Sequence, residues 1–194
     1  KVFAPSSFLY YVAFDQKVEK LLHHNLFFDT DFEQHAVEIY DEPQLPKNPL
    51  FYANFSSITD PDLAPEGKEV GFFLIPVAVD LEDNQNVHDR YFELIMDRIQ
   101  KNTDVDLRKH VLFKKSFGVK DFKERYHSCR GNAYGLANTL LQTSILRPQI
   151  DNKKIKNLFY TGQLTVPGPG VPPALISGKV VTDYILKNQH RILK

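Results

Sequence analysis

The chain has 194 residues, of which 42% are hydrophobic and 12% aromatic, and this composition excludes disordered and fibrous proteins. Its 24 basic and 24 acidic side chains cancel, so the chain lacks the positive charge of a dedicated nucleic-acid-binding protein. The charges are unevenly distributed, because residues 28–110 hold 18 acidic and 7 basic side chains whereas residues 111–194 hold 4 and 14. A phosphate-bearing ligand is therefore expected to favour the second part.

The longest apolar run, Phe72–Val79, is interrupted by Pro76. It is far shorter than the roughly 20 residues that a membrane-spanning helix needs, so it predicts a buried strand. The single cysteine, Cys129, excludes an intrachain disulfide and a cysteine-based zinc module, and it is interpreted as a buried, unreactive thiol in a reducing compartment. The first residue is Lys1 and the only methionine is Met96, which suggests a processed chain or a piece of a longer one.

The first part of the chain is expected to form a sheet with helices. Runs of aromatic and branched residues predict strands at Phe8–Phe14, Leu21–Phe28, Leu50–Ser57, Val70–Val79 and Val111–Phe117. Thr30 and Glu33 have the spacing of a capping box, which predicts a short helix with an inner face of Phe32, Ala36, Ile39 and Tyr40. Apolar periodicity predicts a second helix over Asn86–Lys101, with inward positions at Val87, Tyr91, Leu94, Ile95 and Ile99.

The remaining elements lie in the basic part of the chain. Helices are predicted over Asp121–Tyr126 and over Asn132–Ser144, the second with Leu136, Leu140 and Leu141 facing inward. Asn157–Thr161 predicts a strand that runs into a loop rich in glycine and proline, and Pro172–Lys187 has helical spacing again. The chain is therefore expected to end in a strand, a loop and a helix.

The loop Gly162–Pro173 is the most informative local feature. Its glycines would let the backbone approach a ligand closely, and the following helix would offer unpaired amides and the positive end of its dipole to an anion or an electron-rich ring edge. The loop is not a dinucleotide fingerprint, because Pro173 stands in place of the third glycine, and Gly178-Lys179 lacks the other residues of a P-loop. The pattern alone leaves a ligand site and a plain tight turn as equal alternatives.

No residue pattern assigns a catalytic side chain or a metal ligand. His23 and His24 are adjacent and are expected on opposite faces of a strand, while His35 follows Asp31 by one helical turn without a third ligand in sight. Cys129 near His127 is not interpreted as a catalytic pair, and the G-x-S-x-G signature of serine hydrolases is absent from the sequence. The 15 Phe and 9 Tyr are assigned mainly to the core, with an apolar tunnel as the alternative.

Two runs near the end of the chain, Asn157–Gly162 (NLFYTG) and Thr165–Pro172 (TVPGPGVP), carry a resemblance to a known family. Together they resemble the C-terminal FAD-contacting signature of bacterial-type phytoene desaturases, the carotenoid desaturase branch of the flavin amine oxidase superfamily. Segments that are also similar to the family, and in its order, are Leu22–Asn25, Thr59–Gly67 and Arg130–Leu136. The sequence departs from many members at Val166, where they carry His, and at Pro169, where they carry a small residue.

This resemblance implies an FAD-dependent oxidoreductase that removes two hydrogens from a long isoprenoid polyene, with hydride passing to the flavin. It places the flavin against Gly162, Gln163, Gly170, Val171 and Pro172. The family's N-terminal nucleotide-binding part and its G-x-G-x-x-G are missing from this chain, so the isolated chain is expected to bind FAD poorly and to be inactive. No nucleic-acid partner and no metal are expected.

The expected fold class is α/β, as the C-terminal part of a two-domain enzyme. Residues 1–118 would form part of a substrate-binding domain with a mixed or antiparallel sheet, and residues 119–194 would complete the FAD-binding domain. A carotenoid is insoluble in water, so a cytoplasmic protein attached peripherally to a membrane is expected, with the basic second part near anionic lipid or simply solvated. The alternatives are a carotenoid isomerase or retinol saturase of the same superfamily, or a non-catalytic module that binds a hydrophobic ligand.

Overall fold

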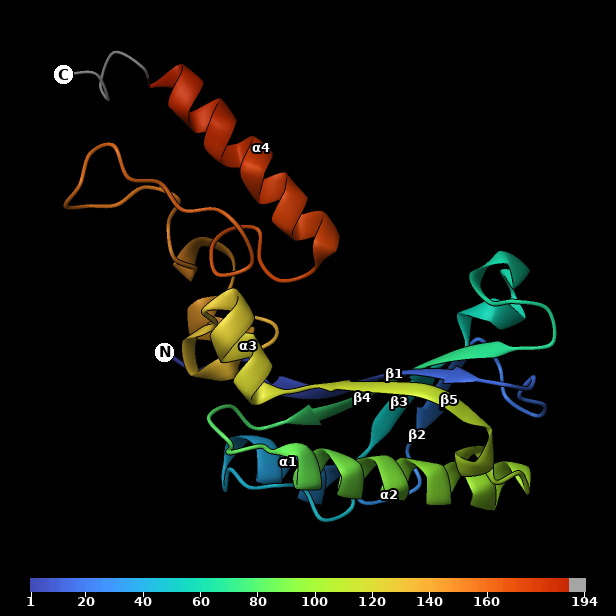
Figure 1. Cartoon of the computed structure of the whole chain (residues 1–194). Coiled ribbons are helices and arrows are strands. Elements are labelled where there is room, and N and C mark those ends of the chain that lie inside the picture. The colour runs from blue at the N-terminus through green and yellow to red at the C-terminus, as the bar shows by residue number, and fades with distance from the viewer. Residues whose placement is uncertain (189–194) are drawn as a thin grey trace. The chain divides into compact units, whose positions relative to one another are not determined.

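The structure, a computed structural model, describes residues 1–188 and divides into two compact units (Figure 1). One unit is Pro5–Asn132, and the other combines Lys1–Ala4 with the residues from Ala133 onward. The expected α/β class is confirmed. The two compact units meet near residue 132. The predicted boundary at residue 118 between a substrate-binding and an FAD-binding part stays a prediction.

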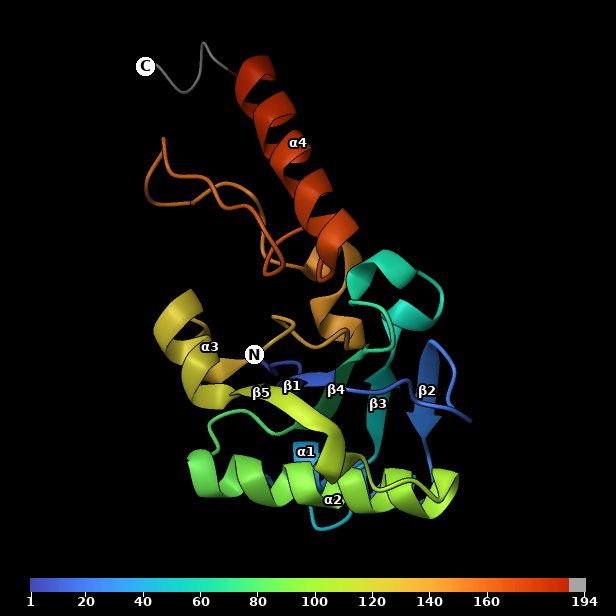
Figure 2. The same cartoon turned by 45° about the vertical axis from the view of Figure 1, so that its right-hand side comes forward.

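A five-stranded antiparallel sheet forms the centre of the larger unit, with the strand order β2-β3-β4-β1-β5. The strands are β1 (Ser6–Phe14), β2 (His24–Phe27), β3 (Phe51–Asn54), β4 (Glu69–Val77) and β5 (Val111–Phe117). All five were predicted from the sequence, although β2 and β3 are shorter than expected. The helices α1 (Phe32–Tyr40) and α2 (Gln85–Thr103) lie on the same side of this sheet in both views (Figures 1 and 2).

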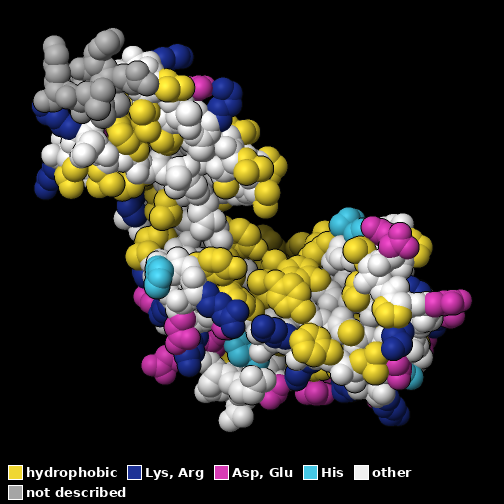
Figure 3. All heavy atoms as spheres, turned by 45° about the horizontal axis from the view of Figure 1, so that its top comes forward, with side chains coloured by type: hydrophobic (Ala, Val, Ile, Leu, Met, Phe, Trp, Pro, Cys, Tyr) yellow, Lys and Arg dark blue, Asp and Glu magenta, His cyan; other side chains and the backbone are white. Residues whose placement is uncertain are grey.

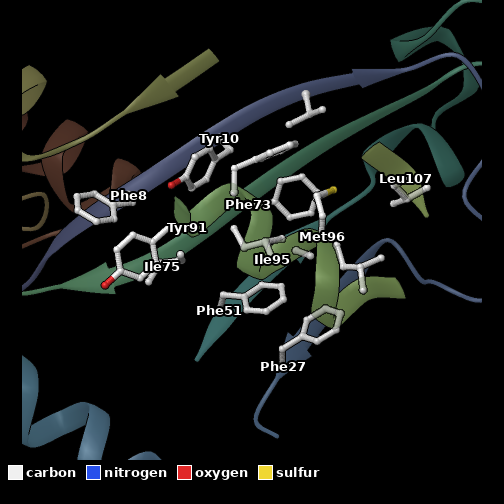
Figure 4. Close-up of a cluster of buried hydrophobic side chains, with 14 of the residues drawn as sticks. Phe8, Tyr10, Phe27, Phe51, Phe73, Ile75, Tyr91, Ile95, Met96 and Leu107 are labelled. Atoms are coloured by element: carbon white, nitrogen blue, oxygen red, sulfur yellow. The ribbon is translucent and has the colours of Figure 1, made fainter. Parts of the chain in front are cut away.

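The hydrophobic core lies between the sheet and α2 (Figure 4). Alternate residues of β1 face it, because successive side chains of a strand point to opposite sides, and Phe8, Tyr10 and Phe14 are fully buried. The side chains that α2 contributes are Tyr91, Phe92, Ile95, Met96 and Ile99. Three of these were predicted from helical spacing, whereas Val87 and Leu94 are only partly buried. Each fully buried aromatic or aliphatic side chain stabilises the fold by about 1.5–3 kcal/mol.

The start of α1 differs from the prediction. The capping residue is Asp31 rather than Thr30, because the Asp31 carboxylate accepts the amides of Glu33 (2.9 Å) and Gln34 (3.2 Å). The Thr30 hydroxyl instead donates to the Asn48 carbonyl at 2.9 Å. The capping-box prediction was therefore wrong by one residue.

The predicted inner face of α1 is correct only in part. Ala36 and Ile39 are partly buried, but Phe32 and Tyr40 are exposed. The two buried side chains of the helix are His35 and Glu38. The Leu50 amide donates to Nδ1 of His35 (3.1 Å), so Nε2 carries the proton that it donates to the Pro76 carbonyl (2.9 Å). Glu38 accepts the amide of Lys47 at 3.3 Å. Polar groups face inward here because the irregular segment between α1 and β3 has backbone amides that need partners.

Two predictions about the smaller unit, which contains the residues from Ala133 onward, were wrong. The stretch 132–144 is not a helix but an irregular segment with short 3₁₀ turns at Leu140–Gln142 and Ser144–Leu146, in which Leu140 and Leu141 are exposed. Gly135 has φ +83°, and a Cβ atom there would lie 3.1 Å from the Gln163 carbonyl oxygen, so the backbone turns where a helix was expected. The predicted strand over residues 157–161 is reduced to a single bridge between Asp151 and Phe159.

Two further helices complete the structure. The predicted short helix near Asp121 is confirmed as α3 (Val119–Tyr126), whose Phe122 ring lies 4.9 Å from the ring of Phe117 on β5. The predicted C-terminal helix is confirmed as α4 (Val171–Lys187). Within residues 1–188, no helix combines the length and the apolarity needed to cross a bilayer.

Candidate functional site

The glycine-rich loop that precedes α4 bends at residues with positive φ. Gly162, Gly168 and Gly170 have φ angles of +97°, +136° and +113°, which other residues rarely adopt. A Cβ atom added at Gly162 would meet no atom within 4 Å, so this part of the backbone is open to a neighbour. The loop can therefore present its main chain to a flat ligand.

A buried serine of α4 fixes the start of this loop. The Gly162 amide donates to Oγ of Ser177 at 2.7 Å, and the hydroxyl groups of Thr161 and Ser177 lie 2.8 Å apart. Ser177 donates in turn to the Ala174 carbonyl at 2.6 Å and is completely buried. This bond network places Gly162 beside the second turn of α4. Ser177 was not predicted as a site residue, because nothing in the local pattern links it to a glycine 15 residues earlier.

A buried arginine holds the middle of the loop. The Arg147 guanidinium donates to the carbonyl oxygens of Gln163 and Thr165, both at 3.0 Å. Only 2% of the Arg147 residue is exposed, and this burial lowers the pKa of its guanidinium. Arg147 was not predicted as a site residue, and it lies three residues after the predicted helix Asn132–Ser144, in a stretch for which no element was predicted.

The first turn of α4 offers fewer donors than the sequence analysis expected. Pro172 and Pro173 have no amide hydrogen, and the Ala174 amide donates to the Gly170 carbonyl at 2.9 Å. The amides left at this tip are those of Gly170 and Val171. The positive end of the helix dipole remains, since it comes from the whole helix.

The predicted cofactor-binding residues thus fall into two places along one loop. Gly162 and Gln163 lie at its start beside Ser177, and Gly170, Val171 and Pro172 lie where α4 begins. The segment 161–173 contains no acidic residue. Its open glycine backbone and the amides at the tip of α4 therefore suit an electron-rich ring edge. These donors fit the ring of a flavin, and the contacts themselves stay a prediction.

The larger unit has a second candidate surface on the face of the sheet that α1 and α2 do not cover. Here β1 and β4 present Tyr11 and Phe72, whose rings lie 5.3 Å apart, and β5 presents Phe113. Tyr11 and Phe113 are about half exposed. Hydrophobic side chains gather over the sheet in Figure 3, and a shallow hollow of about 320 Å³ is lined by Tyr11, Val12, Ala13, Asn54, Ser56, Val70, Gly71, Phe72 and Phe113.

This open face follows from the sequence of the strands. Apart from Ser6, Ser7 and Glu69, both alternating sets of side chains on β1 and β4 are apolar or aromatic. Helices cover only one set, so the other is left as an apolar surface. The aromatic residues were assigned mainly to the core, and the structure shows that some of them line this surface. An exposed apolar hollow of this kind is typical of a site for a hydrophobic ligand.

The cysteine and one histidine prediction were wrong. Cys129 is exposed rather than buried. The rings of His23 and His24 lie 4.1 Å apart rather than on opposite faces, because His23 precedes β2 and does not follow its alternation. His24 contacts the Tyr52 hydroxyl at 2.6 Å. The part of the chain that the structure describes contains no group of three His, Cys, Asp or Glu side chains arranged to hold a metal.

No protein-family model matches the chain. It is 41% identical over 188 residues to carotenoid 3,4-desaturase of Haloarcula japonica, covering 97% of this chain and 38% of that protein. It is 30% identical over 198 residues to zeta-carotene-forming phytoene desaturase of Myxococcus xanthus, covering 97% of this chain and 37% of the relative.

A third relative is 4,4'-diapophytoene desaturase (4,4'-diaponeurosporene-forming) of Staphylococcus aureus, which is 32% identical over 195 residues, with 96% of this chain and 38% of the relative covered. The chain therefore spans less than two fifths of the length of the curated relatives that it matches. This coverage is consistent with the C-terminal portion that the sequence analysis expected.

Proposed function

We propose that this chain, which is homologous to carotenoid desaturases over nearly its whole length, is the C-terminal part of an FAD-dependent carotenoid desaturase. The observation that carries the proposal is the 41% identity to a carotenoid 3,4-desaturase across 97% of the chain. The loop before α4 supports it, because its open glycine backbone and helix tip suit a flavin ring.

The reaction would remove two hydrogens from an isoprenoid polyene, and FAD, when bound, would supply the hydride-accepting chemistry. The residues of this chain would bind and orient the ring. Gly162 and Gln163 would approach it through their backbone, and the amide of Val171 and the dipole of α4 would face its electron-rich edge. An α-helix dipole contributes about 0.3–1 kcal/mol in such a place, so it tunes the flavin rather than drives the reaction.

The uncovered face of the sheet would form one wall of the polyene site. A hydrocarbon offers no hydrogen-bonding groups, so its affinity must come from buried apolar area at about 25 cal/mol per Å². The rings of Tyr11, Phe72 and Phe113 provide such area in the hollow on this face. No proton acceptor is assigned, because none of the described acidic side chains lines this hollow.

The test is an assay of the full-length protein that contains this chain, loaded with FAD and given phytoene in liposomes. Products are separated by chromatography and weighed by mass spectrometry. A loss of two hydrogens per new double bond, with absorption at longer wavelength, supports a desaturase. A geometric isomer of unchanged mass would indicate an isomerase, a gain of hydrogen a saturase, and binding without conversion a ligand-binding module. Each of these three results would overturn the proposal.

We also propose that the protein is cytoplasmic and attaches peripherally to a membrane, because a carotenoid would have to reach it from a bilayer. Co-sedimentation with liposomes of neutral and of anionic lipid tests this. Binding to anionic vesicles that weakens at high salt would support a contribution from the basic residues. If the protein sediments with neither the neutral nor the anionic vesicles, the proposal of membrane attachment is contradicted.

A further inference from the structure

We propose that Arg147 is the positioning residue of the glycine-rich loop: its buried guanidinium fixes the loop backbone and supplies the positive charge that stabilises reduced flavin bound there. The inference rests on the proposed function for its second half only. The control of the loop conformation by Arg147 depends only on contacts within this chain.

The guanidinium uses its donors on oxygens that are all uncharged. Nε donates to the carbonyl of Thr165 at 3.0 Å, and one terminal nitrogen donates to that of Gln163 at 3.0 Å. The remaining contacts are with Oδ1 of Asn138 at 2.9 Å and the carbonyls of Gln142 at 3.4 Å and Leu136 at 3.5 Å. One side chain therefore ties the loop to the segment that precedes it, in a geometry that only a planar five-donor group can make.

The loop is also packed closely around this side chain. A Cβ atom added at Gly168 would lie 3.3 Å from Cζ of Arg147, so the backbone of Gly168 lies directly against the guanidinium. Thr165 adds a further restraint, since its hydroxyl donates to the Pro148 carbonyl at 2.8 Å. Residues 163–168 thus curve around Arg147. Without it, the carbonyls of Gln163 and Thr165 would lose their donor in a buried site.

The charge of Arg147 has no carboxylate partner among residues 1–188, in contrast to arginines such as Arg108 and Arg130, which form ion pairs. A buried cation surrounded only by carbonyl dipoles is costly, and a negatively charged group near it lowers that cost. Reduced flavin carries more negative charge than oxidised flavin. A flavin lying on this loop would therefore be easier to reduce because of Arg147.

Two substitutions separate the two roles. Arg147→Lys keeps the charge but loses the planar set of donors, whereas Arg147→Gln loses both. Arg125→Gln is the matched control, because it removes a positive charge from an exposed side chain of α3 whose ion pair is with Asp121 at 3.8 Å. All variants are made in the full-length protein.

The first readout is amide hydrogen exchange of residues 161–170 without flavin. Both Arg147 variants should exchange roughly tenfold faster in this loop, since its restraint is lost, and Arg125→Gln should not. The second readout is the flavin midpoint potential of the loaded protein. It should become more negative in Arg147→Gln, stay near that of the wild type in Arg147→Lys, and be unchanged in Arg125→Gln.

The outcomes separate this inference from the proposed function. An unchanged loop exchange in both Arg147 variants, or an unchanged potential in flavin-loaded Arg147→Gln, would overturn the proposal. A wild-type protein that binds no flavin would instead overturn the proposed function, and the exchange result would still decide the positioning role. If Arg147→Gln fails to fold, faster loop exchange in Arg147→Lys supports the positioning role and normal exchange refutes it.

Discussion

Replacement of Gly118 by alanine should destabilise the larger unit strongly. Gly118 lies between β5 and α3 with φ −144°, an extended conformation that any residue adopts, so the obstacle is space and not backbone strain. A Cβ atom there would lie 2.0 Å from Oδ2 of Asp83 and 2.6 Å from Cε1 of His88. These two side chains are buried and form a hydrogen bond of 2.9 Å.

Neither partner can move away at low cost. The other oxygen of Asp83 accepts the Lys120 amide at 3.0 Å, and the His88 ring packs 4.8 Å from the ring of Phe8. Burial by itself would raise the pKa of Asp83. The hydrogen bonds from His88 and Lys120 have a larger combined effect and lower this pKa, so they keep the buried carboxylate ionised. Overpacking costs about 1–3 kcal/mol and a broken buried pair about 3–5 kcal/mol. We therefore expect Gly118→Ala to lower the free energy of unfolding by about 3 kcal/mol.

Thermal and urea unfolding followed by circular dichroism measure this loss. For a protein of this size, 3 kcal/mol corresponds to a melting temperature about 10 °C lower. Gly178→Ala is the control, because a Cβ atom there would lie 4.0 Å from the nearest atom, Oγ1 of Thr161, and alanine should stabilise α4 by about 0.5–1 kcal/mol. A Gly118→Ala protein as stable as the wild type would show that the space at Gly118 is not limiting.

Three other predictions concern single side chains. Burial lowers the pKa of His35 below 6.5 in the folded chain. Below about pH 6.5 the unfolded chain therefore binds a proton that the folded chain does not, and the free energy of unfolding should decrease as the pH falls. In urea titrations between pH 6.5 and 5, His35→Gln should lack this decrease. Ser177→Ala removes the acceptor of the Gly162 amide and should lower the free energy of opening this part of the loop by about 1–3 kcal/mol. Hydrogen exchange of that amide should then be faster, and exchange as slow as in the wild type would contradict the prediction. Phe72→Asp places a charge in the hollow of the sheet face and should weaken carotenoid binding without changing flavin content, whereas unchanged binding would remove that face from the proposed site.

Apolar periodicity correctly predicted the elements whose side chains pack in the hydrophobic core between the sheet and α2. β1 and α2 are examples, since Tyr10, Ile95 and Ile99 repeat at strand or helix spacing and all face the core. The same reasoning failed over residues 132–144. Leu136 and Leu140 have helical spacing, yet Gly135 adopts a positive φ and Leu140 is exposed. Spacing records where apolar residues lie in the sequence, and it does not record whether the backbone between them can continue a helix.

The remaining misses share one physical cause, which also bears on the candidate site. His35, Ser177 and Arg147 are buried because each satisfies backbone groups of an irregular segment distant in sequence, and no local pattern reports such a bond. In the glycine-rich loop the motif residues supply conformational freedom, whereas Ser177 and Arg147 select one conformation from it. A motif of glycines alone would populate many bends. The recognisable part of the sequence is therefore the glycine-rich motif, which we propose as the flavin-contacting segment, and the two residues that hold its backbone in place lie outside it.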